Sequence, residues 1–360
     1  MLLSGFYSSS ARLRKSIDQF NSVTLISSGG FNKQAAQLGA RAIFADNYWW
    51  TGGSNQPTYK IPADSNTPTA LSTISSSPII LGYADHCLIG IIINNVSTTT
   101  YTITFNAYDI ETLSIVKTAT TSSFSTSSKA YPVEVYHAQY CGNLAKTAIA
   151  NQYTTLIQSN SVFVEIGKIT FTFTKSSGFS EISYTTQRFD TAQLSSKVYP
   201  SGAIGNGNIT PIQVASGCSG STKVYAIQGS SYKVLEGVEV SSYPPSTPWC
   251  DDNYIYITCT TSTSASGYLR FFRTSKTAPS LTFTVVDKPS WTYQSTNTPE
   301  CLTGFNYDGQ YYYGLIHQGS GVGIYRSSDF STWTKMPPTF HATNDNIYTI
   351  SYPGERGFYE

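Results

Sequence analysis

Residues 323–337 read GIYRSSDFSTWTKMP, two short runs with β-strand character joined by a polar turn. The carboxylate of Asp329 can accept a backbone N–H two residues further on and so fix the turn. Trp333, four residues after the aspartate, opens the next strand and can pack beneath the turn. The spacing therefore predicts a hairpin corner in which Asp329 and Trp333 have structural roles.

The same corner recurs along the chain. Asp109 follows the strand-like run 101–105, and Asp190 follows the strand-like run 181–186. In both cases three residues separate the aspartate from a large apolar residue. We expect Asp109, Asp190 and Asp329 to occupy equivalent corners between the third and fourth strands of repeated units.

The length of the repeat indicates a β-propeller. Residues 272–275 resemble residues 325–328, and the three C-terminal units average about 47 residues each, within the range of propeller blades. Roughly two dozen strand-like runs with regular turn signals indicate an all-β chain. Because closure removes exposed sheet edges, we predict a single closed β-propeller with seven blades, or six as the alternative.

Two terminal features complete this prediction. Residues 10–20 are the only helix candidate, because their apolar residues recur on one helical face. We therefore divide the chain into an N-terminal extension with a short helix (1–20) and the propeller (21–360). Residues 346–351 are expected to supply the inner strand of a blade that residues 22–60 finish, which would latch the ring.

The composition points to a protein that faces an external medium. Only 12% of the 360 residues are charged, against about 25% in an average protein, and the net charge is +1. Such a chain lacks the basic footprint of a nucleic-acid binder. The N-terminus lacks the apolar core of a signal peptide, and no apolar run is long enough to span a bilayer. We expect a virion-surface or extracellular location without a classical signal peptide; a processed fragment would also fit.

Cysteine and histidine give no sign of a metal or cofactor. The six cysteines leave two alternatives open, three disulfides or buried free thiols, and none of them forms the C-x-x-C pair of a zinc or redox site. The four histidines are scattered without ligand spacing. We predict no cofactor and no metal.

Residues 299–337 resemble one blade of the furanosidase-type propeller hydrolases, glycoside hydrolase families 43 and 32. The resemblance lies in DGQYY (308–312) and RSSDFSTW (326–333) and covers about a tenth of the chain. It implies a propeller with three acidic residues facing a central funnel, where two carboxylates act across a sugar. None of the acids available here carries the flanking residues of that family. The candidate catalytic residues are Asp46, Asp85, Asp251 and Glu300.

Trp49 and Trp50 are the candidate binding residues. Adjacent residues of a strand point to opposite faces, so one indole could face outward and stack on a sugar ring. The alternative is that both rings cover the seams between blades.

Two hypotheses about function follow. The first is a non-enzymatic structural or attachment protein of a virion or cell surface, which binds a host glycan or another virion protein. Its composition, rich in Tyr, Ser and Thr and poor in charge, is similar to that of structural proteins of viruses that infect hyperthermophilic archaea. The alternative is a furanosidase-type glycoside hydrolase that uses the funnel carboxylates.

Overall fold

The computed structural model describes residues 41–46, 48–52, 58–62, 69–71, 78–97, 100–125, 144–158, 163–193, 197–205, 207–218, 223–235, 248–260, 269–286, 302–307, 309–316 and 323–335. Every regular element in these residues is a β-strand, and there are 25 of them. The helix predicted for residues 10–20 lies outside the described residues, as does the boundary at residue 20.

The strands form six antiparallel sheets, named A to F, and in each sheet four strands follow one another in chain order. Sheet A contains β1 (Arg41–Ala45), β2 (Tyr48–Gly52), β3 (Thr58–Pro62) and β4 (Thr69–Leu71). Sheet B contains β5 (Ile79–Ala84), β6 (Cys87–Asn95), β7 (Thr100–Asp109), β8 (Ile115–Thr120) and a fifth strand, β9 (Phe124–Ser125), which pairs with β7. Sheet C contains β10 (Ala145–Lys146), β11 (Gln152–Gln158), β12 (Phe163–Thr174) and β13 (Gly178–Gln193).

The remaining three sheets repeat the pattern. Sheet D contains β14 (Lys197–Ile204), β15 (Ile212–Cys218), β16 (Val224–Gln228) and β17 (Ser231–Leu235). Sheet E contains β18 (Trp249–Cys250), β19 (Tyr254–Thr260), β20 (Leu269–Ser275) and β21 (Thr284–Val286). Sheet F contains β22 (Leu302–Tyr307), β23 (Tyr312–Ile316), β24 (Gly323–Ser327) and β25 (Thr334–Lys335).

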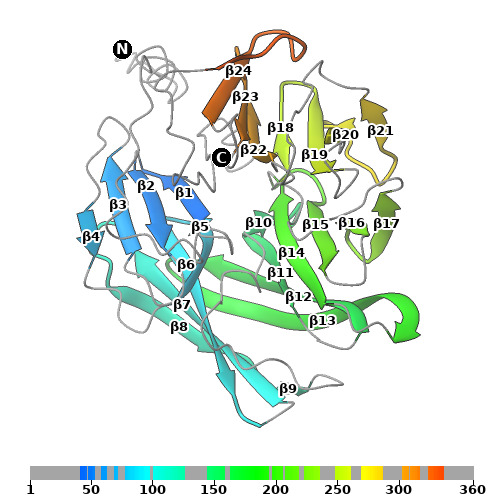
Figure 1. Ribbon diagram of the computed structural model, residues 1–360. Helices are drawn as coiled ribbons and strands as arrows, with labels where there is room; N and C mark the ends of the chain where they lie inside the picture. Colours follow the sequence, from blue (N-terminus) through cyan, green and yellow to red (C-terminus); the bar gives the residue numbers. More distant parts are fainter. Residues whose placement is uncertain are drawn as a thin grey trace, which may run out of the picture.

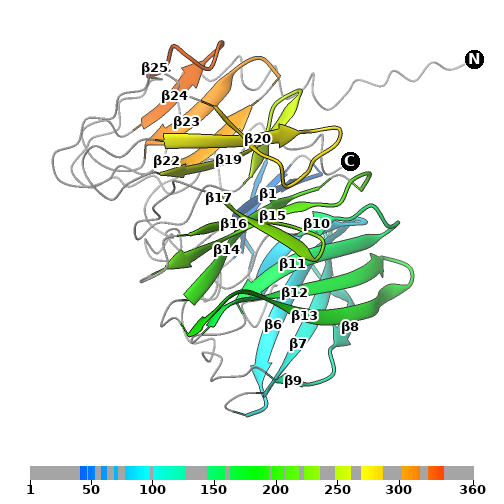
Figure 2. The ribbon, with the colours of Figure 1, turned by 90° about the vertical axis from the view of Figure 1, so that its right-hand side faces the viewer.

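The sheets are arranged around a common centre. In Figure 1 the first strands (β1, β5, β10, β14, β18 and β22) lie toward the middle, and fourth strands such as β4, β8, β17 and β21 lie toward the rim. Figure 2, a view turned by 90°, shows the β6–β7 hairpin and β9 extending beyond the other strands of sheets B and C. Four-stranded meanders in this arrangement are built like propeller blades.

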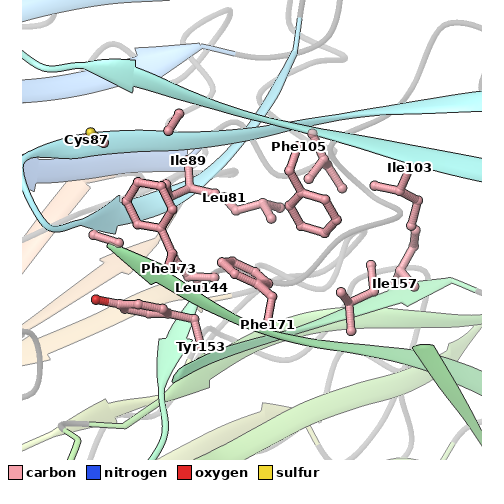
Figure 3. Close-up of a cluster of buried hydrophobic side chains, with 14 residues drawn as sticks. Leu81, Cys87, Ile89, Ile103, Phe105, Leu144, Tyr153, Ile157, Phe171 and Phe173 are labelled. Carbon is pink, nitrogen blue, oxygen red and sulfur yellow. The ribbon is translucent and has the colours of Figure 1, made fainter. Parts of the chain in front are cut away.

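Successive sheets pack face to face, and each of the five contacts, here called seams, has its own apolar cluster. The clusters join sheets A and B, B and C, C and D, D and E, and E and F. The seam between sheets B and C is shown in Figure 3, where Phe105 from β7 meets Phe171 from β12 with ring centroids 5.0 Å apart. Since side chains alternate across a strand, a sheet in the middle of this series is apolar on both faces.

Described cysteines contribute to these seams. Cys87 in the B–C seam and Cys259 in the D–E seam are buried free thiols. Burial raises the pKa of the Cys87 thiol to about 11. Cys141 and Cys301 lie outside the described residues, and the side chain of Cys218 is not described.

The expectation of an all-β chain made of four-stranded antiparallel sheets is confirmed for the described residues. The latch, in which residues 346–351 supply the inner strand of a blade that residues 22–60 finish, stays a prediction, because residues 22–40 lie outside the described residues. Residues 41–71 form the four described strands of sheet A. Residues 346–351 themselves lie outside the described residues.

The seams make a direct prediction about stability. Phe171 is fully buried and contacts the rings of Phe105, Tyr153 and Phe179. We expect Phe171→Ala to lower the free energy of unfolding by about 3–5 kcal/mol, because it opens a cavity in the B–C seam. Denaturant unfolding measures this change. Ile115→Ala on β8, where the side chain is 51% exposed, is the control, and equal losses from the two variants would contradict the seam model.

Candidate functional site

Acidic residues gather at one end of the sheets. In an antiparallel meander, the turn from the first to the second strand lies at the same end as the turn from the third to the fourth. Asp46, Asp85 and Asp251 lie in first-to-second turns, and Asp109 and Asp329 lie at third-to-fourth turns. This end of the molecule is called the turn face below.

Asp109 and Asp329 hold their turns in the same way. The Oδ1 atom of Asp109 accepts N–H bonds from Glu111 at 3.0 Å and Thr112 at 2.9 Å. The Oδ1 atom of Asp329 accepts them from residues 331 and 332, both at 2.8 Å. Both aspartates therefore bond the backbone two and three residues ahead, as expected of a corner.

Asp190 does not share this position. It lies inside β13, the fourth strand of sheet C, whereas the turn between the third and fourth strands is formed by residues 175–177. The equivalence predicted for Asp190 is therefore corrected. The spacing of aspartate and leucine was present, but β13 is 16 residues long and runs through it.

In the corner of sheet F, Phe330 is more deeply engaged than Trp333. Phe330 has a left-handed backbone, with φ of 62°, which is unusual for a bulky residue. This conformation places its ring 4.8 Å from that of Tyr312 and 4.9 Å from that of Phe271 in sheet E. Trp333 is half-buried and packs against Phe330 and Phe305, with centroids 5.8 and 6.0 Å away.

Asp46 and Asp85 are exposed residues of two-residue turns. Asp46 has φ of 49°, and Asp85 and His86 have φ of 41° and 60°, which is the left-handed region that such hairpin turns require. The Oδ2 atom of Asp85 accepts the backbone N–H of Lys175 at 2.7 Å and so ties sheet B to sheet C. The carboxylate of Asp85 therefore has a local structural role.

Asp251 is the most constrained carboxylate. Its side chain is 6% exposed. Its Oδ1 atom accepts the N–H groups of Asn253 and Tyr254 at 2.8 and 2.7 Å. Its Oδ2 atom accepts the hydroxyls of Tyr256 at 2.7 Å and Tyr312 at 3.2 Å. These four bonds match the roughly four acceptor sites of a carboxylate.

Asp251 belongs to a group of residues at the E–F seam, here called the tyrosine–carboxylate cluster: Asp251, Asp252, Tyr256, Tyr307 and Tyr312. The hydroxyl of Tyr307 in sheet F donates to Oδ2 of Asp252 in sheet E at 3.1 Å. Burial and the nearby Asp251 raise the pKa of both Tyr256 and Tyr312, so both hydroxyls stay protonated. Asp252 is exposed, and Tyr307 and Tyr312 are half-buried, so this cluster reaches the surface of the turn face.

An aromatic base supports the cluster. Trp249 is fully buried, stacks on Tyr256 with centroids 4.2 Å apart, and donates its indole N–H to Thr258 at 2.9 Å. The guanidinium of Arg273 lies 4.1 Å from the ring centroid of Tyr254. This packing fixes the two tyrosine hydroxyls that meet Asp251.

The three described candidate catalytic acids lie in three different sheets. Asp46 and Asp85 are in sheets A and B, and Asp251 is in sheet E, with no hydrogen bond recorded between any two of these three described residues. Glu300 lies outside the described residues. In the part of the chain that the structure covers, no group of three or more His, Cys, Asp or Glu residues is placed to hold a metal ion.

Trp50 is not available as a binding residue. Its side chain is 1% exposed and lies in the A–B seam, where its indole N–H donates to the Ala45 carbonyl at 3.3 Å. The binding role predicted for Trp50 is corrected, because the ring covers a seam as in the alternative reading. Trp49 lies on β2, and its side chain is not described.

Sequence reasoning missed Asp252, Tyr307 and Tyr312. A signal was present, because Tyr-x-Tyr follows the paired Asp251 and Asp252 at residues 254–256. That spacing places two rings on one face of a strand directly after an acidic turn. It does not show that the partner rings come from a different sheet.

Comparisons with known proteins do not assign an activity to this chain. No family model matches the sequence, and no curated protein matches it. Among solved structures, the chain is similar to a putative 6-phosphogluconolactonase from Bacteroides uniformis, with 14% identity, a TM-score of 0.45 and 82% of each chain covered. It is also similar to the β-propeller domain of the Trilobed protease from Pyrococcus furiosus, with 11% identity, a TM-score of 0.38, and 82% of this chain and 81% of that chain covered. The described ranges contain no helix of the length and apolar character needed to cross a membrane.

The corner aspartates predict how stability depends on pH. The ion pair with Lys175, at 2.6 Å, holds the pKa of Asp109 well below its usual range, and N–H bonds from Thr332 and Ser331 do the same for the pKa of Asp329. A carboxyl whose pKa is lower in the folded state stabilises the fold above its unfolded pKa of about 3.9 and loses that contribution as the pH falls further.

We therefore expect the midpoint of denaturant unfolding to fall between about pH 4 and pH 2. At pH 6 the double variant Asp109→Asn, Asp329→Asn should unfold at a lower denaturant midpoint than the wild type. Its midpoint should also decrease less than that of the wild type when the pH is lowered. If the wild type and the variant show parallel pH profiles, these two carboxylates do not stabilise the corners.

Proposed function

We propose that this chain is a non-catalytic binding protein, a structural or attachment protein of a virion or other external surface. The proposal rests on the hydrogen bonds that the carboxylates at the turn face form. Asp251 has both oxygens occupied by four hydrogen bonds, while the neighbouring Asp252 and the ring of Tyr307 reach the surface. Such a cluster is suited to holding a ligand group in place.

Glycoside hydrolysis makes a different demand on the acids. It needs a pair of carboxyl groups across one sugar, one of which takes up and releases a proton. Protonating Asp251 would break at least one of its four hydrogen bonds, because the oxygen that carries the proton can no longer accept a hydrogen bond at that position. Asp85 is likewise engaged, by the backbone of sheet C. The resemblance in residues 299–337 concerns strands and a corner, which a binding propeller also needs.

The surface of sheet B fits a partner that is recognised by many weak polar contacts. Asn94 donates to the hydroxyl of Thr104 at 3.0 Å, and Thr104 bonds to the hydroxyl of Thr120 at 3.1 Å, so uncharged groups form a row across three strands. Contacts of this kind are individually weak. On a particle that displays many copies, avidity can replace strong single-site affinity. The partner proposed is a host surface glycan or another virion protein.

We also propose that the six described sheets belong to one closed ring of six or seven blades. The support is the unbroken series of five face-to-face seams from sheet A to sheet F. Closure would bury the outer faces of the first and last sheets in the same manner.

Binding and catalysis can be separated with one set of variants. We expect the isolated full chain to bind host surface preparations or virion proteins weakly, and particles that display it to bind much more tightly. Tyr307→Ala should weaken this binding, because it removes a half-buried ring of the cluster. Tyr232→Ala, which removes a tyrosine 39% exposed on β17, is the matched control and should leave it unchanged.

The same proteins are then assayed for hydrolysis of aryl arabinofuranosides, xylosides and fructans. We expect no turnover. Turnover that disappears in Asp251→Asn or Glu300→Gln would replace the binding proposal with the furanosidase alternative.

A further inference from the structure

We propose that a compact anion, of the size of chloride, binds at the turn-face end of the C–D seam, between the ammonium of Lys168 in sheet C and the side-chain amide of Gln213 in sheet D. This site is separate from the tyrosine–carboxylate cluster and goes beyond the function proposed above. Two observations support it: a buried amide whose hydrogens have no acceptor, and a half-buried ammonium without a carboxylate partner.

The amide of Gln213 is buried in the C–D seam. Gln213 lies on β15, opposite Ile227 and two residues before Ala215. Both of these residues belong to the apolar cluster of the C–D seam, so the side chain of Gln213 also points toward sheet C. It is 1% exposed, and among the described residues no group accepts a hydrogen bond from its Nε2 atom. Since a buried donor is costly without a partner, an acceptor is expected beside it.

The ammonium of Lys168 faces the same seam from the other side. Lys168 lies opposite Leu156 and two residues after Ile166, which both belong to the C–D cluster. Its Nζ atom donates to the Gly229 carbonyl at 2.9 Å, which leaves two of its three N–H donors. No carboxylate of the described residues forms an ion pair with it, and burial lowers its pKa. A positive charge is therefore half-buried here without a negative charge to offset it.

The strand registers place the two groups in the same part of the seam. Gly229, whose carbonyl holds the Lys168 ammonium, comes two residues after Ile227, the cross-strand partner of Gln213. Two residues span roughly 7 Å along a strand. The ammonium is therefore held about one side-chain length from the row that carries Gln213. An acceptor of atomic size can lie between these two donors.

Other polar side chains on this face of sheet C already donate their hydrogens within the protein. The hydroxyl of Thr154 donates to the Ile169 carbonyl at 3.0 Å, and the hydroxyl of Thr170 donates to that of Thr154 at 3.5 Å. The Nε2 atom of Gln187 donates to the Ser230 carbonyl at 3.1 Å. Lys168 and Gln213 differ from these three, because both keep hydrogens that no described group accepts.

An anion meets both requirements at once. It accepts hydrogen bonds from the amide and from the ammonium, and its charge offsets that of Lys168. A water molecule would satisfy the amide but would leave the lysine charge without compensation. A ligand that reaches an amide only 1% exposed must also be compact. A halide therefore fits this position better than an acidic side chain of a partner or a sugar.

The test uses the full chain in sodium gluconate, with chloride or bromide added at constant ionic strength. Chloride NMR line widths give a dissociation constant, and anomalous scattering from crystals grown in bromide gives the position of the ion. We expect a bromide peak between Nζ of Lys168 and Nε2 of Gln213. We also expect the thermal unfolding midpoint to rise with chloride, because the ligand binds the folded state.

Point variants assign the binding to these two donors. Lys168→Met should weaken chloride binding about tenfold, and Gln213→Leu about fivefold. Lys233→Met removes an exposed ammonium from β17 of sheet D and is the matched control, which should leave chloride binding unchanged. Circular dichroism establishes that each variant is folded. If Lys168→Met does not fold, the two substitutions at Gln213 decide the question.

The second substitution at Gln213 separates an anion site from a merely structural amide. Gln213→Glu places a carboxylate beside Lys168, so an internal ion pair should take the place of the anion. We expect chloride no longer to raise the unfolding midpoint of this variant. Its midpoint in gluconate should be at least that of the wild type in gluconate.

Three results would overturn the anion site. The first is bromide found only at exposed positions, with a water molecule between Lys168 and Gln213. The second is equal loss of chloride binding in Lys168→Met and Lys233→Met. The third is a Gln213→Glu variant that still gains stability from chloride as the wild type does. None of these results would bear on the binding function proposed above, which is tested at the E–F seam.

Discussion

The fold depends on one constraint, that a sheet in the middle of the series has two apolar faces and must be covered on both. Strand β7 shows this most clearly. Phe105 faces sheet C, and Tyr108, three residues later on the opposite face, packs in the seam with sheet A. No single sheet can bury both faces by itself. Successive sheets therefore stack face to face, and each seam gains its own apolar cluster.

This stacking brings the turns of neighbouring sheets together at one end and gives the few carboxylates their roles. Lys175 of sheet C reaches Asp85 and Asp109 of sheet B. Tyr307 of sheet F reaches Asp252 of sheet E. Most carboxylates at the turn face form hydrogen bonds or ion pairs that hold a turn or join two sheets. The cluster at the E–F seam differs because part of its negative charge and aromatic surface remains exposed.

Local patterns predicted the strands and two corners correctly, and failed where a longer-range contact decided the outcome. Asp109 and Asp329 bond the backbone two and three residues ahead, so their role is contained in a short stretch of sequence. Asp190 has similar neighbours but lies within a long strand that packs on sheet D. From the sequence alone, the side chain of Trp50 could face solvent or the protein interior. It is buried because sheet B packs against the face of sheet A on which it lies.

By itself, the sequence determined that the described part of the chain is all-β, that its strands form repeated four-stranded units, and that aspartate fixes two of their corners. Each of these depends on alternation or hydrogen bonding among residues a few positions apart. The tertiary structure alone decided which residues form the candidate site. The bonds from Tyr307 to Asp252 and from Tyr312 to Asp251 join residues 55 and 61 positions apart. Such contacts follow from how two complete sheets pack, and no local pattern specifies that packing.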